Sequence, residues 1–166
     1  MKIERAPEIE SRLRIALRKA RDREIGGLLM GEQVSPAHFR ILDFSLDALS
    51  GSHMHFRRDP QTHQKTLDAF FERTSWDFQR FNYLGEWHSH PSFSVLPSGK
   101  DIQTMTKIVE SETSAINFAV LLIVRLRWRY RIDCTLTFFA RGQEPQRLLP
   151  SSHGFIPGNP IWTLPE

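Results

Sequence analysis

Cysteine is nearly absent from this sequence: Cys134 stands alone among 166 residues, so no disulfide can form within the chain. Disulfide frameworks belong to oxidising compartments, and a chain without one fits a reducing compartment. The first residues lack the apolar core of a signal peptide, and no apolar run approaches the roughly 20 residues of a membrane span. We therefore expect a cytoplasmic protein that has no contact with a membrane.

Internal repeats, low-complexity blocks and a Gly-rich phosphate-binding loop are also missing. Neither sign of charge is in strong excess, because 22 Lys and Arg residues face 19 Asp and Glu residues. The resulting charge of +3 favours an acidic partner only weakly. With 40% hydrophobic residues the chain can form a core, and we expect one domain in residues 1–142. Residues 143–166 are rich in proline and read as a tail that packs on this domain or stays flexible.

The most informative stretch is residues 83–91, Tyr-Leu-Gly-Glu-Trp-His-Ser-His-Pro. An apolar run that ends in His-x-His predicts a β-strand, and residues two apart on a strand point to the same face. His88 and His90 can therefore reach one metal ion. Pro91 cannot donate to a central strand ladder, so the chain must leave the sheet there.

A helix is expected to begin near Ser98, with Asp101 in its first turn. From this position the Asp101 carboxylate can swing back over the end of the strand and join the two histidines. Two neutral imidazoles and one carboxylate suit Zn²⁺, and three protein ligands leave the fourth tetrahedral position open for water. An open position is typical of catalytic rather than structural zinc. The Ser-x-x-Asp pattern is also that of a helix capping box, and the two functions can coexist.

These residues resemble the signature of the JAMM metalloproteases, also called MPN-plus domains. That signature combines His-x-His-Pro with a Ser and an Asp at the spacing of Ser98 and Asp101, and it has a further Glu upstream. Here Glu24 opens the segment Glu-Ile-Gly-Gly-Leu-Leu-Met-Gly, which is similar to the family setting Glu-x-Gly-Gly-x-Leu-x-Gly. The resemblance covers residues 9–137.

The resemblance implies an α/β (α+β) fold, a cytidine-deaminase-like MPN/JAMM domain with a curved mixed β-sheet flanked by about three helices. It implies one Zn²⁺ per chain, held by His88, His90 and Asp101. It also implies a hydrolase in which Glu24 accepts a proton from the attacking water and Ser98 donates to the oxyanion of the tetrahedral intermediate.

The substrate that the resemblance implies is the bond after the C-terminus of a ubiquitin-like protein, either an isopeptide bond to lysine or a peptide bond in a precursor. Gly26 and Gly27 would give a thin Gly-rich tail room to bind. Typical family members need no acid at the position of Glu86, but its place on the same strand face as His88 would let it orient the metal ligands or serve as the general base. The compact chain resembles bacterial JAMM proteins that accompany ubiquitin-like conjugation operons linked with phage defence. Its partners would then be a ubiquitin-like protein or its conjugate and the activating (E1-like) and conjugating (E2-like) proteins of the same pathway.

Two other functions are compatible with parts of the sequence. Relatives of this fold that lack the metal ligands act only as scaffolds, although here every ligand is present. A metal-dependent nuclease or nucleic-acid-binding module is suggested by a basic helix over residues 9–23 and by strict alternation over residues 125–133. The alternation predicts a half-exposed strand whose outer face carries Arg125, Arg127, Arg129 and Arg131. Such a face also suits an acidic protein or solvent, and a nucleic-acid partner is not expected because no nucleic-acid motif is present.

A second His-x-His, at His53 and His55, lies near Asp59 and His63 and is a competing metal site. It lacks an apolar strand to hold it rigid, so the first site is favoured. Asp59 followed by Pro60 is also a helix-start signal.

The remaining elements are expected from hydrophobic periodicity. Helices are predicted over residues 9–23 and 99–112. A further helix is predicted to begin at Pro60 and to include Phe78 on its packed side. The predicted strands cover residues 24–32, 38–49 with a bulge near Asp43, 116–124 and 125–133. The strand over 116–124 is almost entirely apolar and should be buried on both faces.

Overall fold

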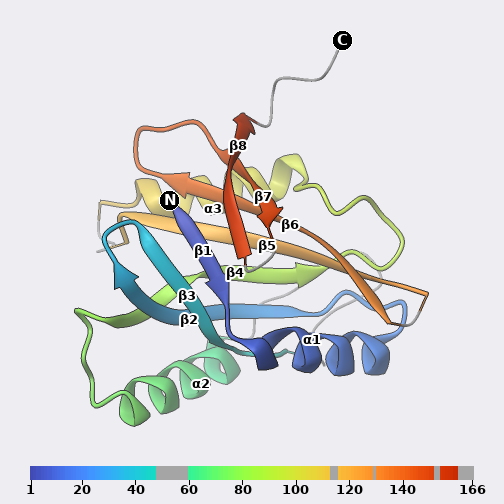
Figure 1. The fold of residues 1–166 in the computed structure, drawn as a ribbon, viewed down its shortest axis with the longest axis horizontal. Coiled ribbons are helices and arrows are strands. Elements are labelled where there is room, and N and C mark those ends of the chain that lie inside the picture. The colour runs from blue at the N-terminus through green and yellow to red at the C-terminus, as the bar shows by residue number, and fades with distance from the viewer. Residues whose placement is uncertain (48–59, 113–115, 129, 152–153, 161–166) are drawn as a thin grey trace.

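The computed structural model describes residues 1–47, 60–112, 116–128, 130–151 and 154–160. Three helices and eight strands form this part of the chain (Figure 1). The helices are α1 (Pro7–Ala20), α2 (Pro60–Arg73) and α3 (Gly99–Glu110). The strands are β1 (Lys2–Arg5), β2 (Gly26–Ser35), β3 (His38–Phe44), β4 (Phe81–Ser89), β5 (Phe118–Arg127), β6 (Arg131–Ala140), β7 (Gln146–Ser151) and β8 (Gly154–Pro160). Among the described residues, no helix has the length and apolar character needed to span a membrane.

The strands form one closed barrel in the order β1-β3-β2-β4-β5-β6-β7-β8. The β1–β3 and β4–β5 pairs are parallel and the others antiparallel, so the sheet is mixed, as predicted. The prediction of a curved sheet did not include closure, whereas in the structure β8 pairs with β1 at Ile3↔Phe155 and Glu4↔Gly154 and closes the ring. Three helices accompany the sheet, as the sequence predicted.

The strands that close the ring lie in the proline-rich segment that was predicted to be a tail. Proline is rare inside strands because it cannot donate to a ladder, so Pro150, Pro157 and Pro160 concealed the strand signal. β7 nevertheless pairs with β6, and β8 pairs with both β7 and β1. β7 and β8 are therefore part of the sheet, although both follow the predicted boundary at residue 142.

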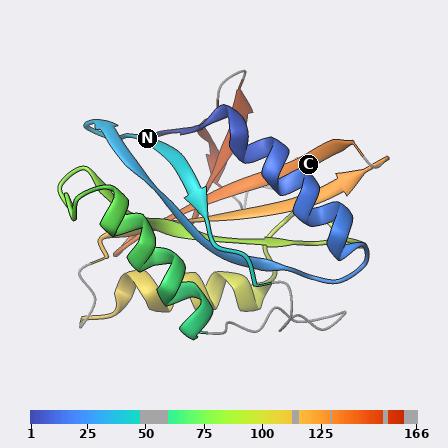
Figure 2. The same ribbon diagram turned by 90° about the horizontal axis from the view of Figure 1, so that it is seen from below.

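Two hydrophobic clusters lie on opposite sides of the central strands, and Figure 2 shows α1 on one side and α3 on the other. On the first side, α1 buries the stripe that its periodicity predicted: Ile9, Leu13, Ala16, Leu17 and Ala20. On the second side, α3 buries Met105 and Val109 against Leu121, Ile123 and Phe139. Because both clusters use β5, its residues 119–124 are buried on both faces, as predicted for a central strand.

The position of α3 follows from the pairing of β4 with β5. These two strands are parallel, so the chain between them must cross back along the sheet, and α3 forms part of this crossover. β4 also pairs with β2 on its other side, with His88 opposite Gly26. The end of β4 is thus enclosed by β2 and β5, and the first turn of α3 comes back toward it.

Some predicted boundaries need correction. Glu24 lies just before β2 rather than within it. α2 ends before Ser75 and Trp76, whose φ angles of 56° and 58° are incompatible with a continuing helix, so Phe78 lies beyond the helix and is 51% exposed. The bulge predicted near Asp43 is present as a register shift in the β2–β3 pairing.

The single strand predicted over residues 125–133 is wrong, because the chain forms a hairpin there. β5 ends at Arg127, Trp128 has φ 47°, and β6 begins at Arg131, which pairs with Arg127. No Asn-Gly or Asp-Gly pair marks this turn, so the alternation of apolar and basic residues runs through it without a break.

Candidate metal centre

The three predicted metal ligands meet at the end of β4. His88 lies in the strand, and His90 follows its last residue, with its N–H donating to the Val124 carbonyl at 2.9 Å. The Nε2 atoms of the two histidines are 3.0 Å apart, and Oδ1 of Asp101 is 3.7 Å from His88 Nε2. One ligand atom of each of the three residues lies within 4.8 Å of the others. The structure therefore brings His88, His90 and Asp101 together as a group that can hold one ion.

The separations between these donor atoms fit zinc. Zn–N and Zn–O bonds of about 2.0–2.2 Å place the corners of a tetrahedron about 3.3–3.6 Å apart. The distances of 3.0 Å between the imidazoles and 3.7 Å from His88 to Asp101 lie on either side of that range. The distance of 3.0 Å between the two Nε2 atoms also suits a hydrogen bond. Such a bond would not explain why the Asp101 carboxylate lies beside the same two atoms.

The tautomer of His90 is set by its neighbour. His90 Nδ1 lies 2.6 Å from the Ser94 carbonyl oxygen, which can only accept, so Nδ1 carries the proton. The lone pair of neutral His90 is then on Nε2, the atom that faces His88 and Asp101. A backbone carbonyl behind a ligand histidine is a common arrangement in metal sites, because it fixes the ring and raises its basicity.

Burial keeps His88 in the form that binds metal. The pKa of His88 is lowered to about 4, chiefly by burial, with the nearby Asp101 carboxylate opposing the shift and His90 adding to it. Its imidazole is therefore neutral at neutral pH and offers a lone pair. A histidine with an ordinary pKa would be protonated in part of the chains under mildly acidic conditions.

Asp101 is oriented by the capping box that the sequence predicted. Ser98 is the N-cap of α3, and its hydroxyl accepts from the Asp101 N–H at 3.2 Å. In return, Asp101 Oδ2 accepts from the Ser98 N–H at 2.7 Å and from the Ser98 hydroxyl at 2.6 Å. One carboxylate oxygen is thus held by the cap and the other, Oδ1, is turned toward His88. Capping and ligand placement are performed by the same pair of residues.

Replacing Ser98 by Ala is expected to lower the free energy of unfolding by about 0.5–2 kcal/mol, because it removes the N-cap of α3. Urea unfolding followed by circular dichroism measures the change. Ser98→Thr keeps the hydroxyl and should retain most of the stability. Equal stability of Ser98→Ala and the unaltered protein would show that the cap contributes nothing.

Glu24 reaches the same site from the segment before β2. It is buried, with 8% of its surface exposed, and it lines one cavity of about 800 Å³ together with His88, His90, Ser98 and Asp101. The cavity also contains Glu86, which is equally buried on the inner part of β4. Two carboxylates outside the ligand cluster therefore face the site.

Ser89 fixes the segment that carries Glu24, a function that the sequence did not reveal. Its side chain points away from the cavity, accepts from the Ile25 N–H at 3.0 Å and lies 3.5 Å from the Arg23 carbonyl. Its N–H donates to the Ile25 carbonyl at 2.8 Å. The residue between the two histidines thus clamps both neighbours of Glu24. The one sign of this function in the sequence was the position of Ser89 between His88 and His90, which places its side chain on the opposite face of the strand.

A second support holds the loop that follows His90. The Arg125 guanidinium donates to the Phe93 carbonyl at 2.9 Å and to Asp133 at 3.2 Å. This loop contains the Ser94 carbonyl that fixes the His90 tautomer. This support could not be predicted from the sequence, since backbone carbonyls carry no residue-type signal.

Gly26 and Gly27, predicted to contact a substrate, have a packing explanation. A Cβ on Gly26 would lie 2.4 Å from the Trp87 carbonyl oxygen, and one on Gly27 would lie 2.1 Å from the Ser45 carbonyl oxygen. Neither residue is among those that line the cavity. The two glycines allow β2 to approach its neighbours closely, so a contact with substrate remains a prediction.

The competing site falls mostly outside the described residues. His53, His55 and Asp59 lie outside the described residues. His63 is described: it is buried, and its Nδ1 lies 2.7 Å from the Ser45 hydroxyl. Within the described residues, the group formed by His88, His90 and Asp101 is the one cluster whose donor atoms lie close enough together to hold a metal ion.

Comparison with solved structures shows that the fold of this chain is a known one. A protein from Desulfitobacterium hafniense has a TM-score of 0.61 at 20% identity, with 87% of this chain and 88% of that chain covered. A protein from Salinibacter ruber has a TM-score of 0.50 at 19% identity, with coverage of 90% and 97%. At such identities the similarity establishes the fold alone.

Comparison of sequences identifies the family. The 26S proteasome non-ATPase regulatory subunit 14 of Dictyostelium discoideum is 25% identical over 142 residues, which cover 85% of this chain and 45% of that protein. The chain thus spans about half the length of this relative. The model of the family described as prokaryotic homologs of the JAB domain matches residues 7–133, most of the chain and all of the ligand cluster. This protein belongs to the prokaryotic homologs of the JAB domain.

Proposed function

We propose that this protein is a zinc-dependent isopeptidase that cleaves after the C-terminus of a ubiquitin-like protein. The observation that carries the proposal is the convergence of His88, His90 and Asp101 on one point, with Glu24 lining the same cavity. Three ligands with an additional buried carboxylate form the donor set of a hydrolytic zinc centre rather than a structural one. Membership of the JAB family supports the same chemistry.

Each residue of the site has a distinct function in the proposed reaction. His88, His90 and Asp101 would hold Zn²⁺, which supplies a Lewis acid and lowers the pKa of water. Glu24 would accept a proton from the attacking water and transfer it to the departing lysine amine. Both steps need a carboxylate at a fixed position, which the bonds from Ser89 to the neighbours of Glu24 provide.

Ser98 would stabilise the oxyanion of the tetrahedral intermediate by donating its hydroxyl proton. That proton is directed at Asp101 Oδ2 in the structure, 2.6 Å away. Donation to substrate therefore requires the hydroxyl to rotate, while the Ser98 N–H at 2.7 Å continues to hold Asp101. Ser98 can change partner without releasing the metal ligand.

The proposed substrate is a ubiquitin-like protein joined to a lysine or to a following peptide, in a bacterial pathway linked to phage defence and located in the cytoplasm. The proteasome subunit from Dictyostelium discoideum, to which the chain is similar, supports a connection with protein degradation machinery. The walls of the cavity include the exposed apolar side chains of Phe93 and Leu96, which are 52% and 46% exposed. Apolar walls beside an acid/base residue suit an extended peptide tail.

A nuclease is less well supported by the same structure. The arginines predicted to form one exposed row are divided by the hairpin turn, and Arg125, Arg127 and Arg131 lie within 3.2–3.5 Å of Asp133. A carboxylate among them weakens attraction for phosphate. A scaffold without catalysis would not need the ligand cluster.

Metal content measured by mass spectrometry on the purified chain tests the site. We expect one zinc per chain in the unaltered protein and in Glu24→Ala, and nearly none in His88→Ala or Asp101→Ala. Thermal unfolding of each variant, with and without zinc, shows whether a loss of metal reflects a loss of fold. Zinc retained by both ligand variants would place the metal elsewhere.

Cleavage is then measured with a quenched fluorescent peptide whose Gly-rich tail is joined to the ε-amine of a lysine. The zinc-loaded protein should release the lysine fragment, and His88→Ala should not. A linear peptide of the same tail distinguishes precursor processing from isopeptide cleavage. Zinc-loaded protein that binds the peptide but leaves both bonds intact would refute the enzymatic function and leave the metal site standing.

A further inference from the structure

A second cavity lies on the other side of the end of β4 from the metal ligands. It has a volume of about 740 Å³, and its walls come from the end of α1, the end of β4 and the β5–β6 hairpin. In Figure 1 and Figure 2 the end of α1 and the tip of this hairpin lie on the same side of the molecule. Nothing in the proposed hydrolysis uses this cavity.

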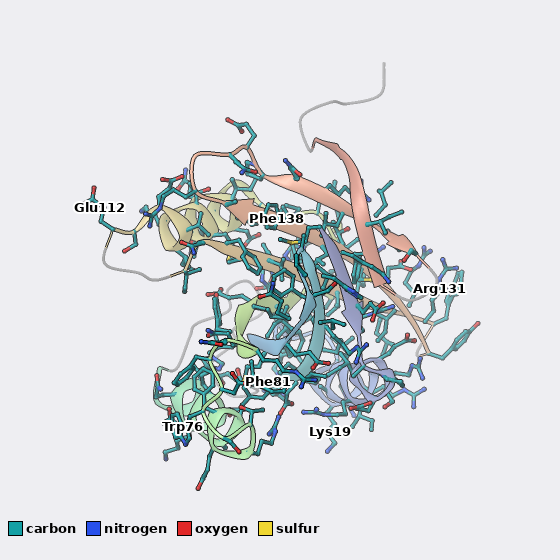
Figure 3. All side chains as sticks on the ribbon, turned by 60° about the vertical axis from the view of Figure 1, so that its left-hand side comes forward. Lys19, Trp76, Phe81, Glu112, Arg131 and Phe138 are labelled. Carbon is teal, nitrogen blue, oxygen red and sulfur yellow. The ribbon has the colours of Figure 1, made fainter. Side chains whose placement is uncertain are left out.

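The lining combines cations with apolar surface. Arg18, Arg21 and Arg125 are its charged members, and Leu17, Leu126 and Trp128 are apolar. Trp128 is 63% exposed, and the Arg127 guanidinium stacks over its ring at 4.8 Å. Among the described residues, no carboxylate lines the cavity. Figure 3 labels Lys19 at the bottom of the view, in the region of α1, and Arg131 at the right.

Two lining residues hold an unfavourable backbone conformation. Arg21, which follows α1, has φ 60° and ψ −108°, and Trp128, in the hairpin turn, has φ 47°. Glycine is the usual residue at such positions, since a Cβ makes them strained. A long cation and a large aromatic ring stand here instead, on opposite walls of one cavity. Both positions thus place a large side chain on the cavity wall at a cost in backbone strain.

The charges that remain available favour an acidic peptide. Asp133 already neutralises part of the charge of Arg125, Arg127 and Arg131. The Arg21 guanidinium makes no hydrogen bond or ion pair with the described residues. To bind a nucleic-acid backbone, a surface needs a continuous row of available cations. To bind a peptide that carries a carboxylate next to an apolar side chain, it needs one cation next to an apolar wall.

We propose that this cavity binds an acidic peptide segment of a partner protein, with a carboxylate paired to Arg21 and an apolar or aromatic residue packed on Trp128. Charge complementarity supplies the attraction, and the apolar wall supplies the contact area. Ser89 and Pro91 line the cavity as well, directly beside the metal ligand His90. The partner would therefore dock on the back of the strand that carries the metal site.

The test is fluorescence anisotropy with fluorescein-labelled peptides in which a pair of glutamates stands at successive distances from a phenylalanine. Matched peptides carry glutamine in place of glutamate. We expect saturable binding of at least one acidic peptide, weakened by added salt because the contact is electrostatic. The glutamine peptides should not bind.

The strained positions provide variants that retain the fold. Arg21→Gly and Trp128→Gly remove the side chain and relieve the backbone, so their stability should equal or exceed that of the unaltered chain. We expect each to weaken peptide binding by about 10-fold or more, as for other central interface residues. Ala37→Gly is the matched control: Ala37 has φ 57° but lies outside the cavity, so binding should not change.

Three results would overturn the proposal. The first is the absence of binding by every acidic peptide. The second is unchanged affinity in both Arg21→Gly and Trp128→Gly. The third is binding of a labelled oligothymidylate, lost in the same two variants, without binding of any peptide, which would assign the cavity to nucleic acid.

Discussion

Replacing Glu24 by Gln is expected to lower kcat for the isopeptide substrate by about 10²–10⁴-fold, the usual contribution of a general acid–base residue. Glutamine has the size of glutamate but cannot accept a proton. Glu24 lies in the cavity but outside the ligand cluster, so the zinc content should stay at one per chain. Steady-state kinetics and metal analysis on the same preparation measure the two effects together.

Glu86→Gln is the matched control for this prediction. Glu86 has the same chemistry, the same low exposure and a place in the same cavity, so its substitution changes the local charge equally. A much smaller loss of kcat is expected, because Glu86 is assigned no proton transfer. If Glu86→Gln lost the activity and Glu24→Gln kept it, the base would be Glu86. Loss of zinc from Glu24→Gln would make Glu24 a ligand.

Replacing Trp87 by Ala is expected to lower the free energy of unfolding by about 3–5 kcal/mol, as for other large aromatic residues deleted from a core. Trp87 stands between Glu86 and His88 but faces the opposite side of β4, where it is completely buried. Its ring packs edge-on against Phe44 at 5.2 Å, and its Nε1–H donates to the Ser45 carbonyl at 2.9 Å. Since whole domains are stable by about 5–15 kcal/mol, this loss approaches the limit of folding.

Two further substitutions show which part of the effect is packing. Trp87→Phe keeps an aromatic ring and removes the hydrogen bond to Ser45, so a smaller loss is expected. Trp76→Ala removes an indole that is 52% exposed, and it should change stability by about 1 kcal/mol or less. Urea unfolding monitored by circular dichroism gives all three values. Equal losses for Trp87→Ala and Trp76→Ala would show that the core around β4 is not what stabilises the fold.

The ligand cluster could be predicted because it depends on local rules. The period of two on a strand puts His88 and His90 together, and the capping pattern at Ser98 fixes where Asp101 stands in its helix. The parallel pairing of β4 and β5 then returns that helix to the strand end. The first two steps use residues close together in the sequence, and the third needs only the crossover that a parallel strand pair requires.

The features that escaped prediction depend on distant pairing or on the backbone. The Ser94 carbonyl behind His90 leaves no trace in residue types, and the bonds from Ser89 join segments 64 residues apart. The hairpin at Trp128 carries no turn residue, since the tryptophan itself adopts the left-handed conformation. Prolines concealed β7 and β8, so the closure of the ring could not be foreseen.

The closure by β8 has a consequence for aggregation. In the ring every described strand has a neighbour on each side, so the described sheet offers no free edge to another molecule. The family match ends at residue 133, early in β6. A chain shortened to that point would lose β7 and β8 with most of β6, and β1 and β5 would each present an unpaired edge. The last strands, which carry none of the proposed chemistry, thus cover the two strand edges through which separate copies could otherwise pair.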